Sequence, residues 1–333
     1  MTRCLSRLYP GLLLLVLGSW AEARQLAGGS PRLPDGVRTE IDLPYAGTDN
    51  PKQRLDLYLP ARAATTEPLP VIAYVHGGGW RGGDKRGAGG QLALYASTGD
   101  YAAASIGYRL TDEATWPAQI HDCKAAIRWL RAHAATYNLD PNRIGVMGTS
   151  AGGHLVAMLG TSGGVAELDG SLGAHGDQSS RVRCVVDWCG PTDFTVLDAD
   201  EHRTGPLALL LGGPLAERRD ASREASPTTY VSKDDPPFLC IHGTHDAVVP
   251  FRQSALLDQA LEGVGVECVL LRVEGGGHKL PFRNPAVADR ARQFFDHHLR
   301  GRRDGLSDET LDAAAAPATS AATPASQSVR PAD

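Results

Sequence analysis

The chain has 333 residues and a formal net charge of −5, and 42% of its residues are hydrophobic. This is the composition of an ordinary globular protein, and a chain of this length can bury the core of one α/β domain. A mildly acidic chain without a long basic run has no electrostatic attraction for nucleic acid or for an anionic membrane surface. The charge of the chain therefore argues against a nucleic-acid partner.

The first 23 residues have the pattern of a secretory signal peptide. Arg3 and Arg7 form a positive end, residues 12–17 are apolar, and residues 21–23 read Ala-Glu-Ala, a small-x-small cleavage site. The apolar stretch is short for a bilayer span, so an uncleaved anchor is the less favoured alternative and no stable membrane insertion is expected. The sequence predicts a secreted or periplasmic protein, with a Gly/Pro-rich linker over residues 24–37.

Strand-like and helix-like segments alternate along the next part of the chain. Short, largely apolar runs predict strands over residues 53–59, 71–75, 101–106, 143–147, 182–188, 237–241 and 266–273. Amphipathic periodicity predicts helices over residues 118–137, 151–159, 251–261 and 285–299. This alternation is typical of βαβ units, so we expect one α/β domain over residues 38–300, with a mostly parallel central sheet and helices on both faces.

Three segments do not follow the alternation. Residues 162–181 are rich in Gly and Ser and predict a surface loop. Residues 194–230 interrupt two predicted strands, and the pattern leaves open whether they partly cover a site or form a surface excursion. Residues 301–333 are rich in Ala, Pro, Ser and Thr, a composition that cannot bury a core, so a disordered tail is expected.

Cysteine usage gives no disulfide pattern. Five cysteines follow the predicted signal peptide, and an odd number leaves at least one without a partner in the chain. Cys184 and Cys189 fall on opposite sides of one predicted strand, which argues against a bond between them. Most of the five lie in apolar segments and are expected to be buried thiols. The pairing stays open.

A serine motif directly follows the predicted strand 143–147. Residues 148–152 read Gly-Thr-Ser-Ala-Gly and lead into the predicted helix 151–159. A serine at a sharp strand-to-helix turn projects its hydroxyl, and the flanking glycines permit a close approach of neighbouring backbone. The N-terminus of the helix favours an anion that develops beside the serine. Ser150 is therefore predicted to be a nucleophile.

A glycine loop ends the predicted strand 71–75. Residues 76–80 read His-Gly-Gly-Gly-Trp, which alone is equally well explained as a flexible loop. Acyl transfer, however, needs N–H donors for its tetrahedral oxyanion, and the loss of one donor raises the barrier by about 3 kcal/mol. We predict an oxyanion hole formed by the backbone N–H groups of Gly77, Gly78, Gly79 and Ala151.

The acid and the base are expected downstream of the serine, in that order. Asp246 follows the predicted strand 237–241, and His278 lies in a glycine loop after the strand 266–273. Asp193 also follows a strand and is the alternative acid. Among the other histidines, His76 is expected to order the glycine loop and His154 to pack within its helix. No two histidines have convincing metal-ligand spacing with a carboxylate, so no metal or cofactor is expected.

Together these segments make the chain resemble the secreted bacterial bifunctional feruloyl and acetyl-xylan esterases, a carbohydrate-esterase branch of the α/β-hydrolases. The glycine loop with its tryptophan is shared with the hormone-sensitive-lipase-like esterases. The resemblance covers residues 41–299, and its marks are the segments 76–80, 108–110, 117–131, 148–154, 190–193 and 234–237. It implies that Ser150, Asp246 and His278 are the catalytic triad, with Trp80 near the acyl pocket.

The activity expected from residues and resemblance is the hydrolysis of carboxylic esters through an acyl-enzyme. Its substrates would be acetyl or other short or aromatic acyl esters of carbohydrates, as small molecules or polysaccharides. The alternatives are an arylformamidase-like amide hydrolase and a peptidase of the prolyl-oligopeptidase type, which takes an oxyanion donor from a tyrosine side chain rather than from such a loop. An inactive binding protein on this fold is disfavoured because no triad member is missing. The natural ester and the oligomeric state stay open.

Overall fold

The computed structural model describes residues 34–198, 203–279, 284–302 and 306–313. These residues belong to one compact unit, Pro34–Asp333. The predicted signal peptide, residues 24–33 of the predicted linker and residues 314–333 of the predicted tail lie outside the described residues. Within the described ranges, no helix has both the length and the apolar character that a membrane crossing needs.

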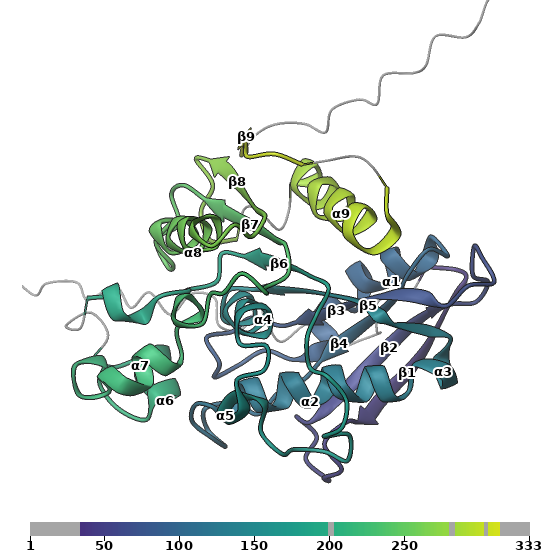
Figure 1. Cartoon of the computed structure of the whole chain (residues 1–333), viewed down its shortest axis with the longest axis horizontal. Coiled ribbons are helices and arrows are strands. Elements are labelled where there is room, and N and C mark those ends of the chain that lie inside the picture. Colours follow the sequence, from purple (N-terminus) through teal and green to yellow (C-terminus); the bar gives the residue numbers. More distant parts are fainter. Residues whose placement is uncertain (1–33, 199–202, 280–283, 303–305, 314–333) are drawn as a thin grey trace, which may run out of the picture. The chain divides into compact units, whose positions relative to one another are not determined.

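One sheet runs through the described part of the chain (Figure 1). Its strands lie side by side in the order β1-β2-β4-β3-β5-β6-β7-β8-β9. The β1–β2 and β2–β4 pairs are antiparallel, and all the other neighbouring pairs are parallel. The bounds are β1 Val37–Pro44, β2 Arg54–Pro60, β3 Leu69–Val75, β4 Ala102–Ile106, β5 Leu139–Thr149, β6 Cys184–Trp188, β7 Phe238–Gly243, β8 Cys268–Glu274 and β9 Glu309–Asp312.

Helices cover both faces of this sheet (Figure 1). A Cβ on Gly145 of β5 would meet Phe295 and Leu299 of α9, whereas Gly160 of α4 lies against Val185, which belongs to the opposite face. Helices α2 and α8 share an apolar cluster with α4, and Tyr95 of α1 contacts Phe295 of α9. The bounds are α1 Gly89–Ser97, α2 Ala118–Ala132, α3 Ala134–Tyr137, α4 Ala151–Thr161, α5 Ala166–Asp169, α6 Pro206–Leu211, α7 Arg219–Glu224, α8 Arg252–Gly263 and α9 Pro285–Arg300.

The mostly parallel sheet with helices on both faces, which the sequence predicts, is confirmed. The structure adds detail inside two of the three segments that do not follow the alternation, 162–181 and 194–230. The predicted loop 162–181 contains α5, whose Asp169 accepts a hydrogen bond from the buried ammonium of Lys124. Segment 194–230 contains α6, α7 and the short 3-10 helices η3 Phe194–Val196, η4 Leu215–Glu217 and η5 Pro227–Thr229. All five cysteines of the described residues are free.

The structure differs from the sequence prediction beyond residue 300. The tail was expected to be disordered from residue 301, but β9 lies within it and pairs in parallel with β8. Two side-chain contacts explain why it returns to the sheet. Glu309 accepts two hydrogen bonds from the guanidinium of Arg290 in α9, and Asp308 accepts one from the backbone N–H of Leu270. A four-residue strand with charged ends has no apolar pattern by which a sequence reveals it.

A buried ion pair fixes the segment that follows the glycine loop. The Lys85 ammonium lies in η2 Lys85–Ala88, at 2.5 Å from Asp56 Oδ1 and 2.6 Å from Asp42 Oδ1. The side chains of Lys85 and Asp56 are 4% and 1% exposed, so the attraction between them is little screened by water. The pair ties the chain behind the glycine loop to β1 and β2.

We predict that Lys85→Met lowers the free energy of unfolding by about 3–5 kcal/mol, because it leaves the Asp56 carboxylate buried without a counter-charge. Equilibrium unfolding in urea measures the change. Arg38→Met is the matched control, since the Arg38–Glu40 pair is about half exposed and its loss costs at most about 1 kcal/mol. Equal shifts in the two variants would contradict the prediction.

Candidate active site

Ser150 makes the sharp turn between β5 and α4. β5 ends at Thr149 and α4 begins at Ala151, so the chain reverses direction at this one residue. Its φ of 56° and ψ of −120° lie in a region that costs a non-glycine residue on the order of 1–3 kcal/mol. The turn is held on both sides, because the Ser150 N–H donates to the Trp188 carbonyl at 2.8 Å and the Ser150 carbonyl accepts from the His154 N–H at 3.0 Å.

The two glycines of the serine motif have no room for a side chain. A Cβ on Gly148 would lie 2.2 Å from the Gly152 carbonyl oxygen, and a Cβ on Gly152 would lie 2.1 Å from the Val75 carbonyl oxygen. Real Cβ atoms are not found so close to backbone. The start of α4 therefore packs directly against the end of β3, where the glycine loop begins.

The structure brings Ser150, His278 and Asp246 into one line of hydrogen bonds. His278 Nε2 lies 3.0 Å from Ser150 Oγ, and His278 Nδ1 lies 2.7 Å from Asp246 Oδ2. An ionised carboxylate can only accept, so Nδ1 carries the proton and donates it to Asp246. Nε2 is then the acceptor for the hydroxyl of Ser150. The three side chains come from the ends of β5, β7 and β8, which parallel pairing brings to one edge of the sheet.

The carboxylate of Asp246 is buried and well supplied with donors. Oδ1 accepts from the backbone N–H groups of Val248 at 2.8 Å and Val249 at 2.9 Å, and Oδ2 lies 3.3 Å from His242 Nε2 as well as 2.7 Å from His278. Burial by itself raises the pKa of Asp246, but the hydrogen bonds from His242, His278 and the two amides outweigh it and hold this pKa well below its usual range. Asp246 is therefore ionised at neutral pH.

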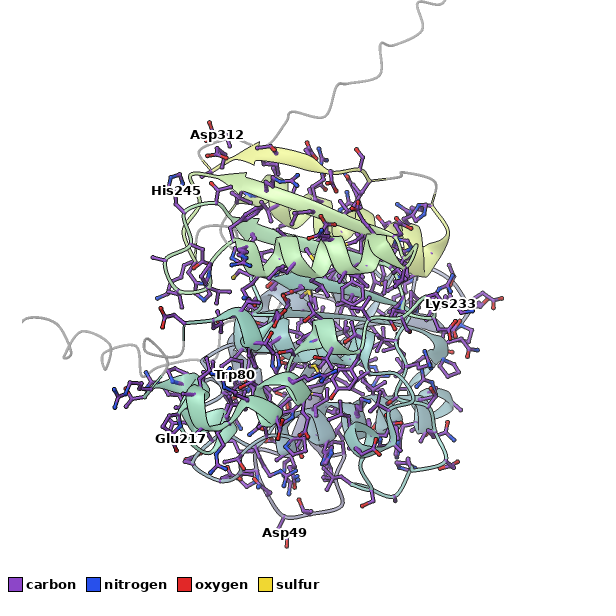
Figure 2. The ribbon with its side chains drawn as sticks, turned by 60° about the vertical axis from the view of Figure 1, so that its left-hand side comes forward. Asp49, Trp80, Glu217, Lys233, His245 and Asp312 are labelled. Carbon is purple, nitrogen blue, oxygen red and sulfur yellow. The ribbon has the colours of Figure 1, made fainter. Side chains whose placement is uncertain are left out.

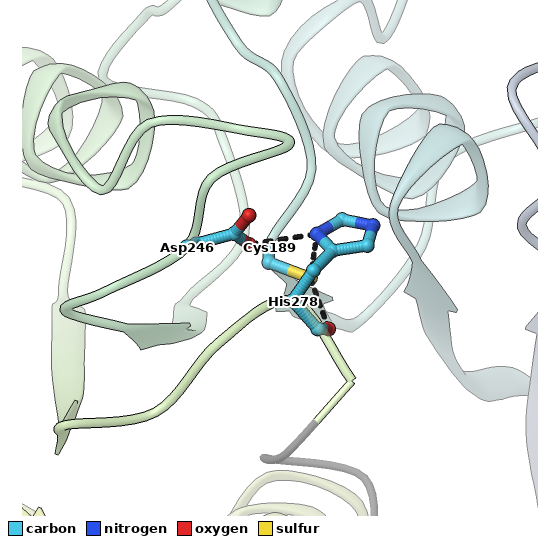
Figure 3. A group of neighbouring side chains, drawn as sticks. All are labelled: Cys189, Asp246 and His278. Atoms are coloured by element: carbon cyan, nitrogen blue, oxygen red, sulfur yellow. Dashed lines mark hydrogen bonds and ion pairs between the residues drawn. The ribbon is translucent and has the colours of Figure 1, made fainter. Parts of the chain in front are cut away.

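A buried thiol lies against the histidine and the aspartate (Figure 3). Cys189 Sγ is 3.6 Å from His278 Nδ1 and 3.7 Å from the His278 carbonyl oxygen. One ligand atom from each of Cys189, Asp246 and His278 lies within 4.8 Å of the other two, so these atoms could hold a metal ion. The same Nδ1 and carboxylate already form the 2.7 Å hydrogen bond that orients His278.

The glycine loop lies beside Ser150. A Cβ on Gly77 would be 3.3 Å from the Cβ of Ser150, and the φ angles of Gly78 and Gly79 are 125° and 61°, which favour glycine. The loop is anchored from behind, because the Tyr108 hydroxyl donates to the His76 carbonyl at 2.9 Å and the two rings stack at 4.3 Å. This agrees with the expected role of His76 in ordering the loop.

An apolar cavity of about 180 Å³ opens beside Ser150 and Ala151. Gly79 and Trp80 form one wall, and η3, α6 and the chain after β7 supply the others. Segment 194–230, whose role the sequence left open, therefore contributes to the lining of this cavity. The apolar side chains that line it include Trp80, Pro191, Phe194, Leu197, Leu207 and Val249.

The other candidate residues are engaged elsewhere. The alternative acid Asp193 caps η3, where its Oδ1 accepts from both the N–H and the hydroxyl of Thr195. His245 is exposed and points away from the sheet (Figure 2). His154 is fully buried in α4, as expected for a packing residue, but both of its ring nitrogens form hydrogen bonds.

Sequence reasoning missed two supporting residues. His242 contacts Asp246 from inside β7, and Cys189 contacts His278 from the turn after β6. The only available signal for His242 was its place in a buried strand four residues before the predicted acid. Cys189 gave no signal, because a cysteine in an apolar segment is most often a packing residue.

Comparisons with known proteins agree with this geometry. The family model described as BD-FAE matches residues 55–261. The probable carboxylic ester hydrolase LipM of Mycobacterium tuberculosis is 30% identical over 249 residues, which cover 71% of this chain and 56% of LipM. Esterase LipC of the same organism is 32% identical over 236 residues, covering 69% and 57%. The chain thus spans little more than half the length of these curated relatives.

Solved structures of similar chains are also esterases. A truncated carbohydrate esterase from gut microbiota has a TM-score of 0.70 and 34% identity, covering 79% of this chain and 96% of its own. The esterase Est2 of Thermogutta terrifontis, with propionate bound, has a TM-score of 0.63 and 26% identity, covering 78% and 93%. The match over residues 55–261 and the shared fold show that the chain belongs to the BD-FAE family of α/β-hydrolases.

Proposed function

We propose that this chain is a serine carboxylic-ester hydrolase with Ser150 as nucleophile, His278 as general base and Asp246 as the orienting acid. One observation carries the proposal. Hydrogen bonds of 3.0 and 2.7 Å run from Ser150 Oγ through both nitrogens of His278 to a buried carboxylate, at the edge of an apolar cavity. A serine hydroxyl becomes nucleophilic when a base in this position accepts its proton.

The reaction proceeds through an acyl-enzyme. Ser150 Oγ bonds to the ester carbonyl carbon while its proton passes to His278 Nε2, and the carbonyl oxygen becomes an anion. We assign the stabilisation of this anion to the backbone N–H groups of Gly77–Gly79 and Ala151, where α4 begins with its positive dipole end. The bond to the alcohol oxygen then breaks, and His278 protonates that oxygen. Water repeats the cycle, releases the acid and returns the proton to Ser150.

The substrates that we propose are acetyl or other short or aromatic acyl esters of carbohydrates, as in feruloyl and acetyl-xylan esterases. The apolar cavity beside Ser150, with Trp80 in its wall, suits an acyl group of limited size. The similarity to a carbohydrate esterase of the gut microbiota supports a sugar as the alcohol. A secreted or periplasmic location, expected from the N-terminal pattern, would give such an enzyme access to polysaccharides.

Ser150→Ala is expected to lower kcat for an aryl acetate by a factor on the order of 10⁵–10⁶, because no other group can form the acyl-enzyme. Release of the phenol measured by absorbance gives the rate. Ser97→Ala is the matched control, since Ser97 is an exposed residue of α1 whose hydroxyl donates to the Leu94 carbonyl. Activity of Ser150→Ala within tenfold of wild type would exclude Ser150 as nucleophile.

Asp246→Asn is expected to lower kcat by roughly 10⁴-fold, because an amide can donate to Nδ1 and favour the tautomer whose Nε2 cannot accept the serine proton. Asp193→Asn tests the alternative acid, and its kcat should stay within a few-fold of wild type.

The effect of Asp246→Asn on the free energy of unfolding depends on pH with a defined sign. Because the folded pKa of Asp246 is lowered, its contribution to stability is present above the unfolded value of about 3.9 and is lost as pH falls below it. The stability gap between wild type and Asp246→Asn should therefore narrow below about pH 4.

A panel of substrates tests the ester class. We expect turnover of an aryl acetate, methyl ferulate and acetylated xylan, with kcat/KM falling for long-chain acyl esters that exceed the cavity. A formyl-anilide and a peptide anilide represent the arylformamidase-like and peptidase alternatives. Faster cleavage of either amide than of the acetate would replace the esterase proposal, and a preference for long acyl chains would leave only a general esterase.

A further inference from the structure

His154 has both ring nitrogens engaged although it is fully buried. It lies in α4, one turn after Ser150. The indole Nε1 of Trp80 donates to His154 Nδ1 at 3.2 Å, and His154 Nε2 lies 2.7 Å from the Ala225 carbonyl oxygen. Neither contact belongs to the hydrogen-bond line between Ser150 and Asp246.

These two partners permit only one protonation state of the ring. The indole N–H is a donor and cannot accept, so Nδ1 must offer a lone pair. The Ala225 carbonyl can only accept, so Nε2 must carry the proton. Burial lowers the pKa of His154 to about 4, against the opposing effect of the Ala225 bond, so the ring is neutral at neutral pH. His154 is thus a fixed tautomer with one acceptor and one donor aimed at two different elements.

Of the two residues that His154 joins, Trp80 lines the apolar cavity and Ala225 lies in segment 194–230, which contributes to the lining. Trp80 follows the glycine loop, has a φ of 56° and lines the cavity. Ala225 directly follows α7 in segment 194–230, and the next residue, Ser226, accepts a hydrogen bond from the Phe194 N–H. The Phe194 ring, which also lines the cavity, lies 5.0 Å from the His154 ring and 5.9 Å from that of Trp80.

We propose that His154 is a positioning residue that sets the acyl-chain selectivity of the site, an inference that rests on the proposed ester hydrolysis. It fixes the Trp80 indole in the wall of the cavity and ties the segment that carries Phe194 to α4. Without its acceptor, the buried indole N–H has no partner, which favours a different indole orientation. The reoriented indole of Trp80 then occupies less of the cavity, and the cavity accepts longer acyl groups.

Two substitutions at His154 separate positioning from mere packing. His154→Leu fills the space but removes both bonds. His154→Gln restores an acceptor and a donor on one planar group, so it can bond Trp80 and Ala225 together. His121→Leu is the matched control, because His121 lies on α2 and contacts the Glu167 carbonyl, away from the cavity lining.

The measurement is kcat/KM for aryl octanoate relative to aryl acetate. We expect His154→Leu to raise this ratio by roughly tenfold, within the range that a few methylenes contribute to selectivity. His154→Gln should return the ratio to within about threefold of wild type, and His121→Leu should leave it unchanged. An unchanged ratio in His154→Leu would overturn the proposal. So would an equal fall of kcat/KM for both esters that His154→Gln does not reverse.

A second measurement does not depend on turnover. The indole N–H resonance of Trp80, assigned from its loss in Trp80→Phe, should be protected from hydrogen exchange in wild type and in His154→Gln. It should exchange faster in His154→Leu. If His154→Leu fails to fold, Trp80→Phe replaces it, because this variant removes the donor, keeps an aromatic ring and should raise the same selectivity ratio. Absence of ester turnover with a protected indole would refute the proposed function alone, whereas an unprotected indole in wild type would refute the role of His154.

Discussion

The active-site geometry depends on the contact between two backbones at the turn around Ser150. The positive φ of Ser150 is held by hydrogen bonds of its own N–H and carbonyl, and Gly152 beside it packs without a side chain against the Val75 carbonyl at the end of β3. That contact, made by backbone atoms alone, places the start of α4 against the start of the glycine loop. A Cβ on Gly77 would lie 2.6 Å from the Thr149 carbonyl oxygen, so the loop approaches the end of β5 too closely for a side chain at this position. Ser150 and the N–H groups beside it are therefore positioned by main chain, which is stiffer than side chains.

The proposed base His278 and the proposed acid Asp246 depend on a different constraint, the cost of burying a carboxylate. Asp246 loses most of its water, and this loss is offset only because donors surround both oxygens. His278 is one of those donors, so the orientation of its ring is coupled to the stability of the buried charge. Cys189, against the other side of Nδ1, is neutral in this setting, since burial raises the pKa of its thiol. The negative charge therefore stays on Asp246, where it favours the imidazolium that forms during proton transfer.

The sequence predicts a site residue where its chemistry requires a local backbone element that the sequence also reveals. Ser150 was predictable because a glycine-flanked serine between a strand and a helix has few other uses, and Asp246 and His278 because parallel strands bring their ends to one edge. The β9 strand was not predictable, since it is held by Arg290 and by the backbone of β8 rather than by an apolar pattern of its own. The lining role of segment 194–230 depends on which distant residues it meets. That is a tertiary property with no local signal.

The buried histidines that support the site join separate elements through both of their ring nitrogens. His242 Nδ1 lies 2.7 Å from the Ser254 hydroxyl, and its Nε2 contacts the Val249 carbonyl and Asp246. The neutral ring of His154 joins Trp80 to Ala225. Each ring ties separate elements together with directional bonds, and because both nitrogens have partners, the cost of burying the ring is offset. The segment that follows the glycine loop is instead held by a buried ion pair, Lys85 with Asp56. The neutral ring of His154 adds no fixed charge near Ser150, which leaves stabilisation of the developing charges to Asp246, the helix N-terminus and the backbone amides.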